Sequence, residues 1–152
     1  MRNEETLNEV HEFLSKNYVE DATGSFRLQY TKDQLKWMLL GPSYDKNMHF
    51  CIRDETKLVG ICTATLLNLM TNSKKLDHHG IVNFLCLDKT NRNKRLALIL
   101  IWEVLRRLFI RSCFQCSYTV ARVIPTPYAR SQVWVRPLNA RKLIEIGMIK
   151  AT

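Results

Sequence analysis

A polar segment between two apolar runs is the first part of this sequence that could do chemistry. Residues 82–87 are mostly apolar, residues 89–94 contain no apolar side chain, and a long apolar and basic segment begins at Arg95. This pattern predicts a strand, a polar loop and a helix. Arg92, Lys94 and Arg95 would then lie at a helix N-terminus, where cations and unpaired backbone N–H groups suit a phosphate group. A solvated basic helix start is the simpler alternative.

Cysteine and histidine spacing gives weaker candidates. Cys113 and Cys116 have the CxxC spacing but lack a second pair of ligands, so a zinc or redox site is not favoured. Residues three apart on a strand point to opposite faces, which would separate the two thiols. His78 and His79 are adjacent in a polar segment, and we expect both to be exposed. Three further cysteines stand in apolar runs, as buried thiols do: Cys51, Cys62 and Cys86.

The charge is unevenly distributed along the chain. The formal net charge is +9, but residues 1–88 carry 10 Lys/Arg and 12 Asp/Glu, whereas residues 89–152 carry 13 Lys/Arg and only 2 Asp/Glu. The basic second half predicts an anionic partner, and nucleic acid, a membrane surface and a phosphorylated cofactor all qualify. A solvated basic face remains the alternative.

Length and composition indicate a single globular domain. The chain has 152 residues, of which 46% are hydrophobic and 24% charged, and this is ordinary for a soluble protein. The first residues are too polar for a secretory signal, and the longest apolar run, Leu96–Trp102, is seven residues and cannot span a bilayer. Together with an odd number of cysteines, these features predict a cytoplasmic protein.

Hydrophobic periodicity predicts a mixed α/β fold. We expect helices at 3–18, 31–40, 94–111 and 141–146, and strands at 26–30, 49–53, 58–67, 81–87 and 114–120. Thr31 and Gln34 form a capping box at the start of the second helix. The order implies a mixed sheet with flanking helices and one strand–helix–strand crossover.

Aromatic residues could form a stacking platform for bases, but core packing is favoured. Trp37 and Trp102 stand in apolar helical runs, and Trp134 is far from both in the sequence. The first turns of the helix at 94–111 are apolar nearly all round, so we expect them to be well buried.

Several short motifs, taken together in order and spacing, resemble the eukaryotic N-myristoyltransferases (glycylpeptide N-tetradecanoyltransferases). The resemblance runs from about Leu7 to Ile146. The matching motifs are Asn83-Phe84-Leu85-Cys86, Lys89…Arg92-Asn93-Lys94-Arg95-Leu96-Ala97, Asn17-Tyr18-Val19-Glu20-Asp21, Phe26-Arg27…Tyr30, Lys57-Leu58-Val59-Gly60, Tyr118-Thr119, Pro125-Thr126-Pro127 and Arg136-Pro137-Leu138-Asn139-Ala140-Arg141-Lys142-Leu143.

The resemblance implies a GNAT-like acyl-CoA N-acyltransferase fold and an acyltransferase activity. The family reaction, a protein lipidation, moves myristoyl from myristoyl-CoA to the N-terminal glycine of a protein, without metal, permanent cofactor or covalent enzyme intermediate. We expect residues 1–152 to be one domain of the N-terminal type, with the family's C-terminal half and its general-base carboxylate absent. We therefore expect weak acyl-CoA binding and poor catalysis by this chain alone.

The resemblance also implies roles for individual residues. The backbone N–H groups of Phe84 and Leu85 would form an oxyanion hole around the thioester carbonyl. Residues that would bind the acyl-CoA are Asn83, Phe84, Leu85, Cys86, Arg92, Asn93, Lys94, Arg95, Leu96 and Ala97. Residues that would contact the glycine peptide are Val19, Asp21, Phe26, Tyr30, Tyr118 and Thr119.

The sequence also departs from the family pattern. An acidic run after Asp21 is replaced by Ala22 and Thr23, and a serine of the phosphate loop is replaced by Asn93. Two alternatives stay open. One is an inactive protein that binds acyl-CoA, or that binds a partner such as ribosomal RNA through its basic surface. The other is a small-molecule GNAT acetyltransferase.

Overall fold

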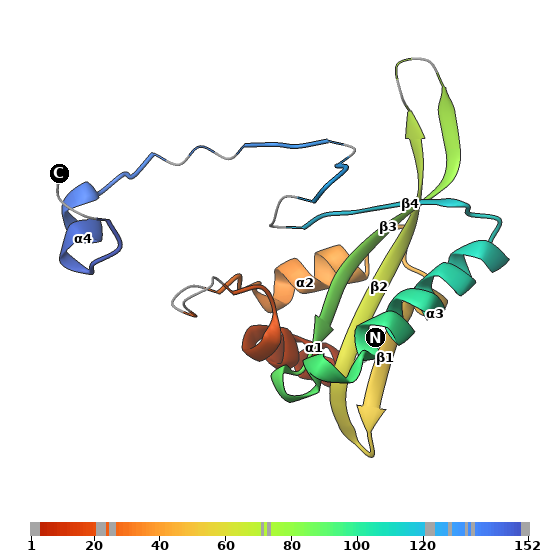
Figure 1. Cartoon of the computed structure of the whole chain (residues 1–152), viewed down its shortest axis with the longest axis horizontal. Helices are drawn as coiled ribbons and strands as arrows, with labels where there is room; N and C mark the ends of the chain where they lie inside the picture. Colours follow the sequence, from red (N-terminus) through yellow and green to blue (C-terminus); the bar gives the residue numbers. More distant parts are fainter. Residues whose placement is uncertain are drawn as a thin grey trace. The chain divides into compact units, whose positions relative to one another are not determined.

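The chain divides into two units that are described separately. The structure is a computed structural model that describes residues 4–20, 24, 27–70, 72, 74–120, 124–127, 129–132, 134 and 136–149. Unit 1 is Met1–Thr119, and unit 2 is Val120–Thr152. Every candidate site residue of the sequence analysis belongs to unit 1 (Figure 1).

Unit 1 is built on a mixed four-stranded sheet in the order β1-β2-β3-β4. The first three strands are antiparallel, and β4 runs parallel to β3. The strands are β1 (His49–Asp54), β2 (Lys57–Met70), β3 (Lys75–Leu87) and β4 (Gln115–Tyr118). A parallel pair requires a crossover connection, and the helix between β3 and β4 supplies it, as the sequence predicted.

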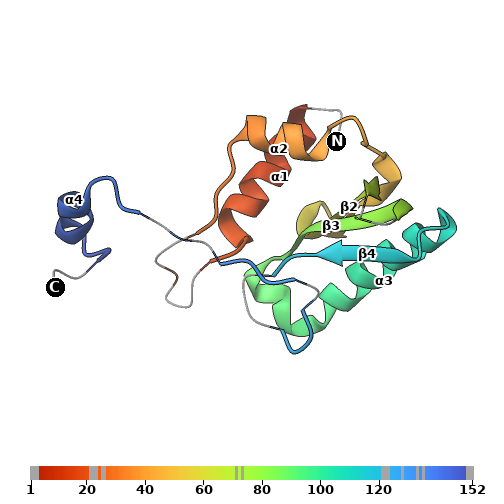
Figure 2. The ribbon, with the colours of Figure 1, turned by 90° about the horizontal axis from the view of Figure 1, so that it is seen from above.

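Helices cover both faces of this sheet (Figure 2). Helices α1 (Glu4–Asn17) and α2 (Lys32–Leu39) lie on one face, and α3 (Leu96–Ile110) lies on the other. Helix α2 begins with the predicted capping box, because Gln34 N–H donates to the Thr31 hydroxyl and Thr31 N–H donates to the Gln34 side chain. Short 3-10 helices precede β1 (η1, Lys46–Met48) and α3 (η2, Lys89–Lys94).

Two apolar cores follow from the alternation of side chains along β2. Ile61 packs with α1 and α2, whereas its neighbour Cys62 packs with α3, because successive strand residues point to opposite faces. From α1 the first core takes Leu7, Val10, Phe13 and Leu14, and from α3 the second takes Leu100, Val104 and Leu108.

The predicted strand at 26–30 is wrong. Within the described residues, this region contains only an isolated antiparallel bridge between Glu20 and Arg27, and 28–30 are irregular. An alternating pattern gives the correct faces for a strand but does not provide a neighbouring strand to pair with. The strand predicted at 114–120 is reduced to β4, while β2 and β3 extend further toward their hairpin than expected.

Burial of the aromatic residues and of α3 was also predicted wrongly. Trp37, Trp102 and Trp134 are 79%, 71% and 83% exposed, so none packs in a core. The outer face of α3 is exposed even in its first turns, since no described element of unit 1 covers the side of the helix that faces away from the sheet. His79 is buried rather than exposed, and Cys51 is exposed rather than buried.

Unit 2 contains α4 (Ala140–Glu145), close to the predicted helix. The Asn139 side chain accepts a hydrogen bond from Lys142 N–H at 3.0 Å, which caps the helix as expected. None of the described residues of this unit is buried. No helix in the described parts of the chain is long and apolar enough to cross a membrane.

Candidate functional site

A β-bulge interrupts β3 at the start of the predicted polar loop. Asn83 pairs with Thr63 and Cys86 pairs with Ile61, so Phe84 and Leu85 lie opposite the single residue Cys62. Phe84 adopts a left-handed backbone with φ of 54°. Bulges of this kind disrupt the ladder locally and re-aim backbone groups, and a bulky residue with positive φ is kept only where its surroundings hold it.

Three aromatic rings hold the bulge in place. Phe84 is buried, and its ring centroid lies 5.8 Å from that of Tyr18 and 5.7 Å from that of Tyr30. The two tyrosine rings are 6.1 Å apart. His11 Nε2 lies 3.1 Å from the Tyr30 carbonyl oxygen, which ties this segment to α1. Packing of this kind stabilises the unusual backbone at Phe84.

The Tyr18 hydroxyl is hydrogen-bonded to the backbone of the bulge. Burial raises the pKa of Tyr18, and a hydrogen bond with the backbone of Phe84 opposes that rise. A hydrogen bond that lowers the pKa stabilises the phenolate, so the backbone acts as the donor. The Phe84 N–H group therefore has the Tyr18 hydroxyl as its partner in this structure.

One edge of β3 is open beside the bulge. β4 pairs with β3 only from His79 to Val82, where Val82 is opposite Tyr118. Among the described strands, none pairs with residues 83–87 on that side. Backbone groups of this part of β3 are thus available to a ligand lying along the edge.

The loop that follows β3 is fixed by Asp88. Its carboxylate accepts hydrogen bonds from Thr90 N–H at 2.9 Å and from the Thr90 hydroxyl at 2.7 Å, and it lies 3.1 Å from Lys57 Nζ. These contacts, led by the Thr90 hydroxyl, lower the pKa of Asp88 to about 2. The loop therefore has a defined shape, the 3-10 helix η2, and Asn91 is buried within it.

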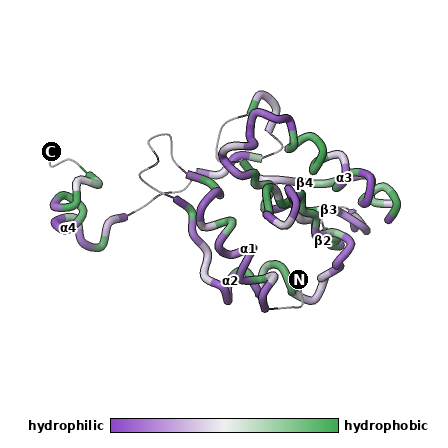
Figure 3. The backbone as a smooth tube through the Cα atoms, turned by 90° about the horizontal axis from the view of Figure 1, so that it is seen from below, coloured by the Kyte–Doolittle hydropathy of each residue, from purple (hydrophilic) through white to green (hydrophobic). Residues whose placement is uncertain are grey.

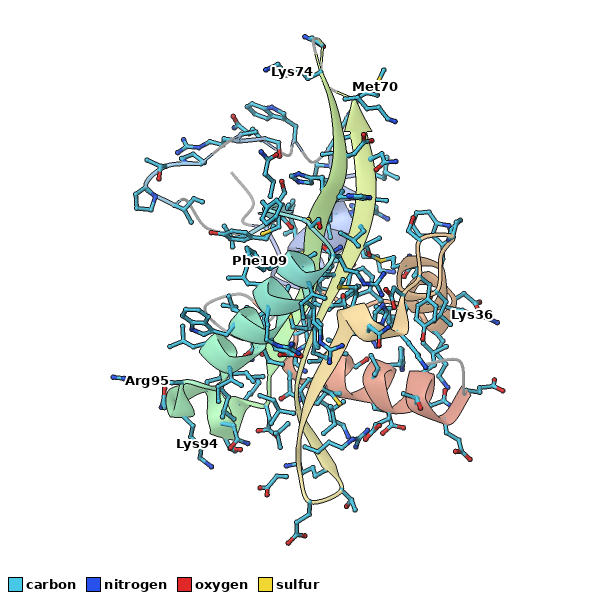
Figure 4. All side chains as sticks on the ribbon, turned by 90° about the vertical axis from the view of Figure 1, so that its right-hand side faces the viewer. Lys36, Met70, Lys74, Lys94, Arg95 and Phe109 are labelled. Carbon is cyan, nitrogen blue, oxygen red and sulfur yellow. The ribbon has the colours of Figure 1, made fainter. Side chains whose placement is uncertain are left out.

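Helix α3 begins with exposed cations and no side-chain cap. Arg95 precedes it with φ of 58°, and the Arg95 side chain makes no capping hydrogen bond. Lys94 and Arg95 project from this end of α3 (Figure 4). The helix start thus combines a first turn that its N-cap side chain does not cap with positive charge, and both features suit a phosphate site.

Arg92 and Glu20 connect the loop to the end of α1. Arg92 donates to the Asn17 carbonyl at 2.7 Å, and Lys89 Nζ lies 2.8 Å from Glu20 Oε2. Glu20 also pairs with Arg27 at 2.8 Å. The Lys89 and Arg27 hydrogen bonds lower the pKa of Glu20, so this carboxylate is ionised and a weak base.

An open cleft of about 430 Å³ lies between these elements. It is lined by Asn17, Tyr18, Val19, Glu20, Leu85, Cys86, Leu87, Arg92 and Ala97. Burial raises the pKa of the Cys86 thiol to about 12, so this residue is not a thiolate nucleophile near neutral pH. The cleft offers backbone donors, one arginine and apolar walls rather than a covalent nucleophile.

The structure brings together most of the predicted site residues. Val19, Leu85, Cys86, Arg92 and Ala97 line one cleft. The others lie nearby on the same elements: Asn83 and Phe84 in the bulge, Tyr30 against Phe84, and Asn93, Lys94, Arg95 and Leu96 at the start of α3.

The remaining predicted residues divide into two groups. Tyr118 ends β4 opposite Val82, about 6–7 Å along the strand from Phe84, and Thr119 follows it. Neither lines the cleft. Asp21 and Phe26 lie outside the described residues.

Sequence reasoning missed Asn17, Tyr18 and Glu20 as site residues. All three line the cleft, and each contacts the loop or the bulge. They belong to the motif Asn17–Asp21 that carried part of the resemblance. The signal in the sequence was that the residues of this motif are consecutive. Four of its five residues, 17–20, line the cleft.

Sequence comparison gives a consistent family. Residues 1–131 match the family described as Myristoyl-CoA:protein N-myristoyltransferase, N-terminal domain. The chain is 40% identical over 147 residues to the glycylpeptide N-tetradecanoyltransferase of Schizosaccharomyces pombe, covering 95% of this chain and 32% of that protein. It is 40% identical over 142 residues to the Drosophila melanogaster enzyme, covering 92% of this chain and 30% of that protein. The chain thus spans about a third of the length of these relatives.

Solved structures agree with the sequence comparison. A Saccharomyces cerevisiae N-myristoyltransferase with bound myristoyl-CoA superposes with a TM-score of 0.83 at 32% identity, covering 99% of this chain and 34% of that chain. An aminoglycoside antibiotic 6'-N-acetyltransferase from Acinetobacter haemolyticus shares the fold alone, with a TM-score of 0.58 at 13% identity. On the family match, the sequence identity and the shared fold, the chain belongs to the N-myristoyltransferase family.

Proposed function

We propose that this chain binds myristoyl-CoA and provides the donor site for transfer of myristoyl to an N-terminal glycine. The named activity of the relatives and the myristoyl-CoA bound to the yeast protein support this proposal. The observation that carries it for this chain is the bulge at Phe84 and Leu85, which opens into the cleft beside a basic helix start.

The proposed role of the bulge is to polarise the thioester. Attack by an amine nitrogen on the thioester carbonyl carbon places negative charge on the carbonyl oxygen, and the C–S bond then breaks to release the CoA thiol. The backbone N–H groups of Phe84 and Leu85 would donate to that oxygen. One such donor typically contributes about 3–4 kcal/mol to the transition state. The rings of Tyr18 and Tyr30 fix the position of Phe84, and the Phe84 N–H would exchange the Tyr18 hydroxyl for the thioester oxygen.

The proposed role of the loop and helix start is to hold the CoA phosphates. Lys94 and Arg95 are exposed cations, and the N–H groups of Leu96 and Ala97 lie in the first turn of α3, which the Arg95 side chain does not cap. Arg92 lines the cleft and Asn93 can donate a hydrogen bond. Asn83 and Cys86 would line the path of the pantetheine along the open edge of β3.

The proposed peptide side of the cleft includes Val19 and Tyr30, with Tyr118 and Thr119 beyond the open edge of β3. We assign Asp21 and Phe26 to the same side on the family resemblance alone. Residues 1–152 would act as one N-terminal-type domain. A cytoplasmic location stays a prediction. Association with ribosomal RNA through the basic second half also stays a prediction, supported by the charge distribution.

A second function, acyl-CoA binding without transfer, is favoured by one observation. Among the described residues that line the cleft, Glu20 is the only carboxylate, and its ion pairs make it a weak base. An amine nucleophile must lose a proton, so a cleft without a competent base favours binding over turnover.

Calorimetric titration with a non-hydrolysable myristoyl-CoA tests the proposal. We expect saturable binding in the micromolar range that weakens as salt is added, because phosphates are bound by cations. The short-chain acetyl analogue should bind more weakly, since it buries less apolar surface. Absence of binding at micromolar concentrations would remove the proposed donor site. Binding without turnover of a glycine peptide would select the second function.

A further inference from the structure

We propose that the outer face of α3 docks this protein onto an anionic lipid bilayer surface. The face is apolar, exposed and flanked by cations, and it takes no part in the cleft described above. Its side chains are Leu98, Ile99, Trp102, Leu105 and Phe109, which we call the α3 outer face.

The α3 outer face has the spacing of one continuous stripe. Leu98, Trp102, Leu105 and Phe109 follow one another at steps of four, three and four, so they stack along one side of the helix. Opposite them, Leu100, Val104 and Leu108 are buried against the sheet. Figure 3 colours much of α3 as hydrophobic.

These side chains stand out from the surface rather than line a deep groove. Trp102 is 71% exposed and Phe109 is 66% exposed. Between them lies only an open hollow of about 690 Å³, whose wall also includes Glu103 and Arg106. Protruding large aromatic and aliphatic groups suit insertion among lipid acyl chains at the interface.

The charge around the stripe favours an anionic surface. Helix α3 and its flanking residues carry five cations, Lys94, Arg95, Arg106, Arg107 and Arg111. Two carboxylates oppose them: Glu103, which pairs with Arg106 and Arg107 at 2.7 and 2.8 Å, and Asp45, which pairs with Arg111 at 2.7 Å. A net positive charge remains even without Lys94 and Arg95, which the donor site would use, and it attracts acidic headgroups.

The same charge disfavours the competing occupant, a second copy of this chain. A symmetric pair joined through the α3 outer face would bring the same excess of cations together from both sides. A lipid surface containing phosphatidylserine meets both features of the face, its apolar stripe and its basic flanks.

Vesicle co-sedimentation of the full chain tests this proposal. The probes are large unilamellar vesicles of phosphatidylcholine alone and of phosphatidylcholine with about one third phosphatidylserine. We expect the chain to bind the acidic vesicles. Replacing both Trp102→Gln and Phe109→Gln should lower the partition coefficient at least about tenfold, because both side chains lose apolar insertion. Arg106→Gln should lower it about fivefold, on acidic vesicles only.

A matched control distinguishes the contribution of the α3 outer face to vesicle binding from that of any exposed aromatic residue. Trp37→Gln on α2 removes an equally exposed tryptophan from another part of unit 1, and it should leave vesicle binding unchanged. In a variant with Trp37→Phe and Trp134→Phe, the remaining Trp102 should show a blue-shifted emission on acidic vesicles.

Three results would overturn the proposal. The first is unchanged binding in the Trp102→Gln, Phe109→Gln variant, and the second is an equal loss in Trp37→Gln. The third is a dimer in solution, seen by light scattering without lipid, that the double substitution dissociates. Since none of these readouts requires CoA, failure here leaves the proposed donor site untouched.

Discussion

The two halves of β3 differ in how their backbone hydrogen-bonding groups are paired with neighbouring strands. Residues 75–82 pair with β2 along most of their length, and residues 79–82 pair with β4 as well. Residues 83–87 bulge, gain no described strand on the β4 side, and pack instead against tyrosines from outside the sheet. The first half has an irregularity of its own at Asp77 and His78 but is paired on both sides over residues 79–82, whereas the second half leaves backbone groups available on the β4 side.

This difference shows how one strand can both anchor itself in the sheet and present an irregular backbone at the site. Pairing with both β2 and β4 over residues 79–82 fixes this part of β3 in the sheet and so fixes the position of the bulge at Phe84. A left-handed backbone at a bulky residue costs on the order of 1–2 kcal/mol, and burial of the Phe84 ring among aromatic neighbours offsets it. The unusual geometry therefore depends on side-chain packing more than on the ladder.

Phe84→Ala should have the largest effect. It removes a buried ring from the contact with Tyr18 and Tyr30. We expect the free energy of unfolding to fall by about 3–5 kcal/mol, because a cavity replaces the ring. Val82→Ala, in the part of β3 that pairs on both sides, should cost clearly less, since Val82 is only half-buried. Denaturant unfolding measures both, and equal losses would contradict the contrast between the two halves.

Arg95→Gly should come next, as a loss of affinity rather than of stability. Arg95 has φ of 58°, which glycine adopts without strain, so the fold should be unchanged or slightly more stable. Losing a charge-assisted bond to phosphate should weaken binding of the myristoyl-CoA analogue about tenfold. Calorimetry measures this, with Lys36→Ala on α2 as the matched control (Figure 4). Unchanged affinity in Arg95→Gly would remove this residue from the site.

Asp88→Ala tests how the loop beside the bulge is held. Loss of the Thr90 hydrogen bonds and the Lys57 contact should cost about 1–2 kcal/mol at pH 7, while Asp88→Asn should cost less because an amide oxygen still accepts from Thr90 N–H. The contribution also depends on pH. The pKa of Asp88 is lowered to about 2, so its stabilisation is complete above pH 3.8 and is lost as pH falls toward 2. Unfolding curves for Asp88→Ala that lose stability over this range as steeply as the parent would contradict this assignment.

Glu20→Gln should have the smallest effect. It removes an ion-pair partner of Lys89 and Arg27 near the surface, so the free energy of unfolding should change little. Because Glu20 no longer opposes phosphate at Lys89 and Arg92, affinity for the acyl-CoA analogue should rise slightly, about twofold. A large loss of affinity, measured by the same titration, would instead identify Glu20 as a ligand contact.

Local patterns predicted the elements around the site well. The capping box at Thr31, the apolar stripe of α1, the hairpin before β2 and the strand–loop–helix at 82–111 all depend on short-range spacing, and the structure confirms them. The bulge at Phe84 was not visible in this way, because it depends on the register between β3 and β2, which the composition of a strand does not determine.

The errors share one physical cause. Apolar character indicates that a surface can be buried but not what buries it. Trp102 on α3 and Trp37 on α2 lie on faces that no described element of unit 1 covers, and Leu28 and Tyr30 have no strand beside them. Conversely, His79 lies in a polar segment but is buried, with Nε2 2.8 Å from the Ser117 hydroxyl on β4, a pairing that only the sheet creates.

Infrared difference spectroscopy of bound myristoyl-CoA carrying carbon-13 at its carbonyl tests the central assignment most directly. If the backbone N–H groups of Phe84 and Leu85 donate to the thioester oxygen, the labelled carbonyl band should move to lower wavenumber on binding. The shift should persist in Leu85→Ala, which keeps both N–H groups, and disappear in Phe84→Ala, which loses the packing that holds the bulge. A bound thioester whose band stays where it is in buffer would contradict the account.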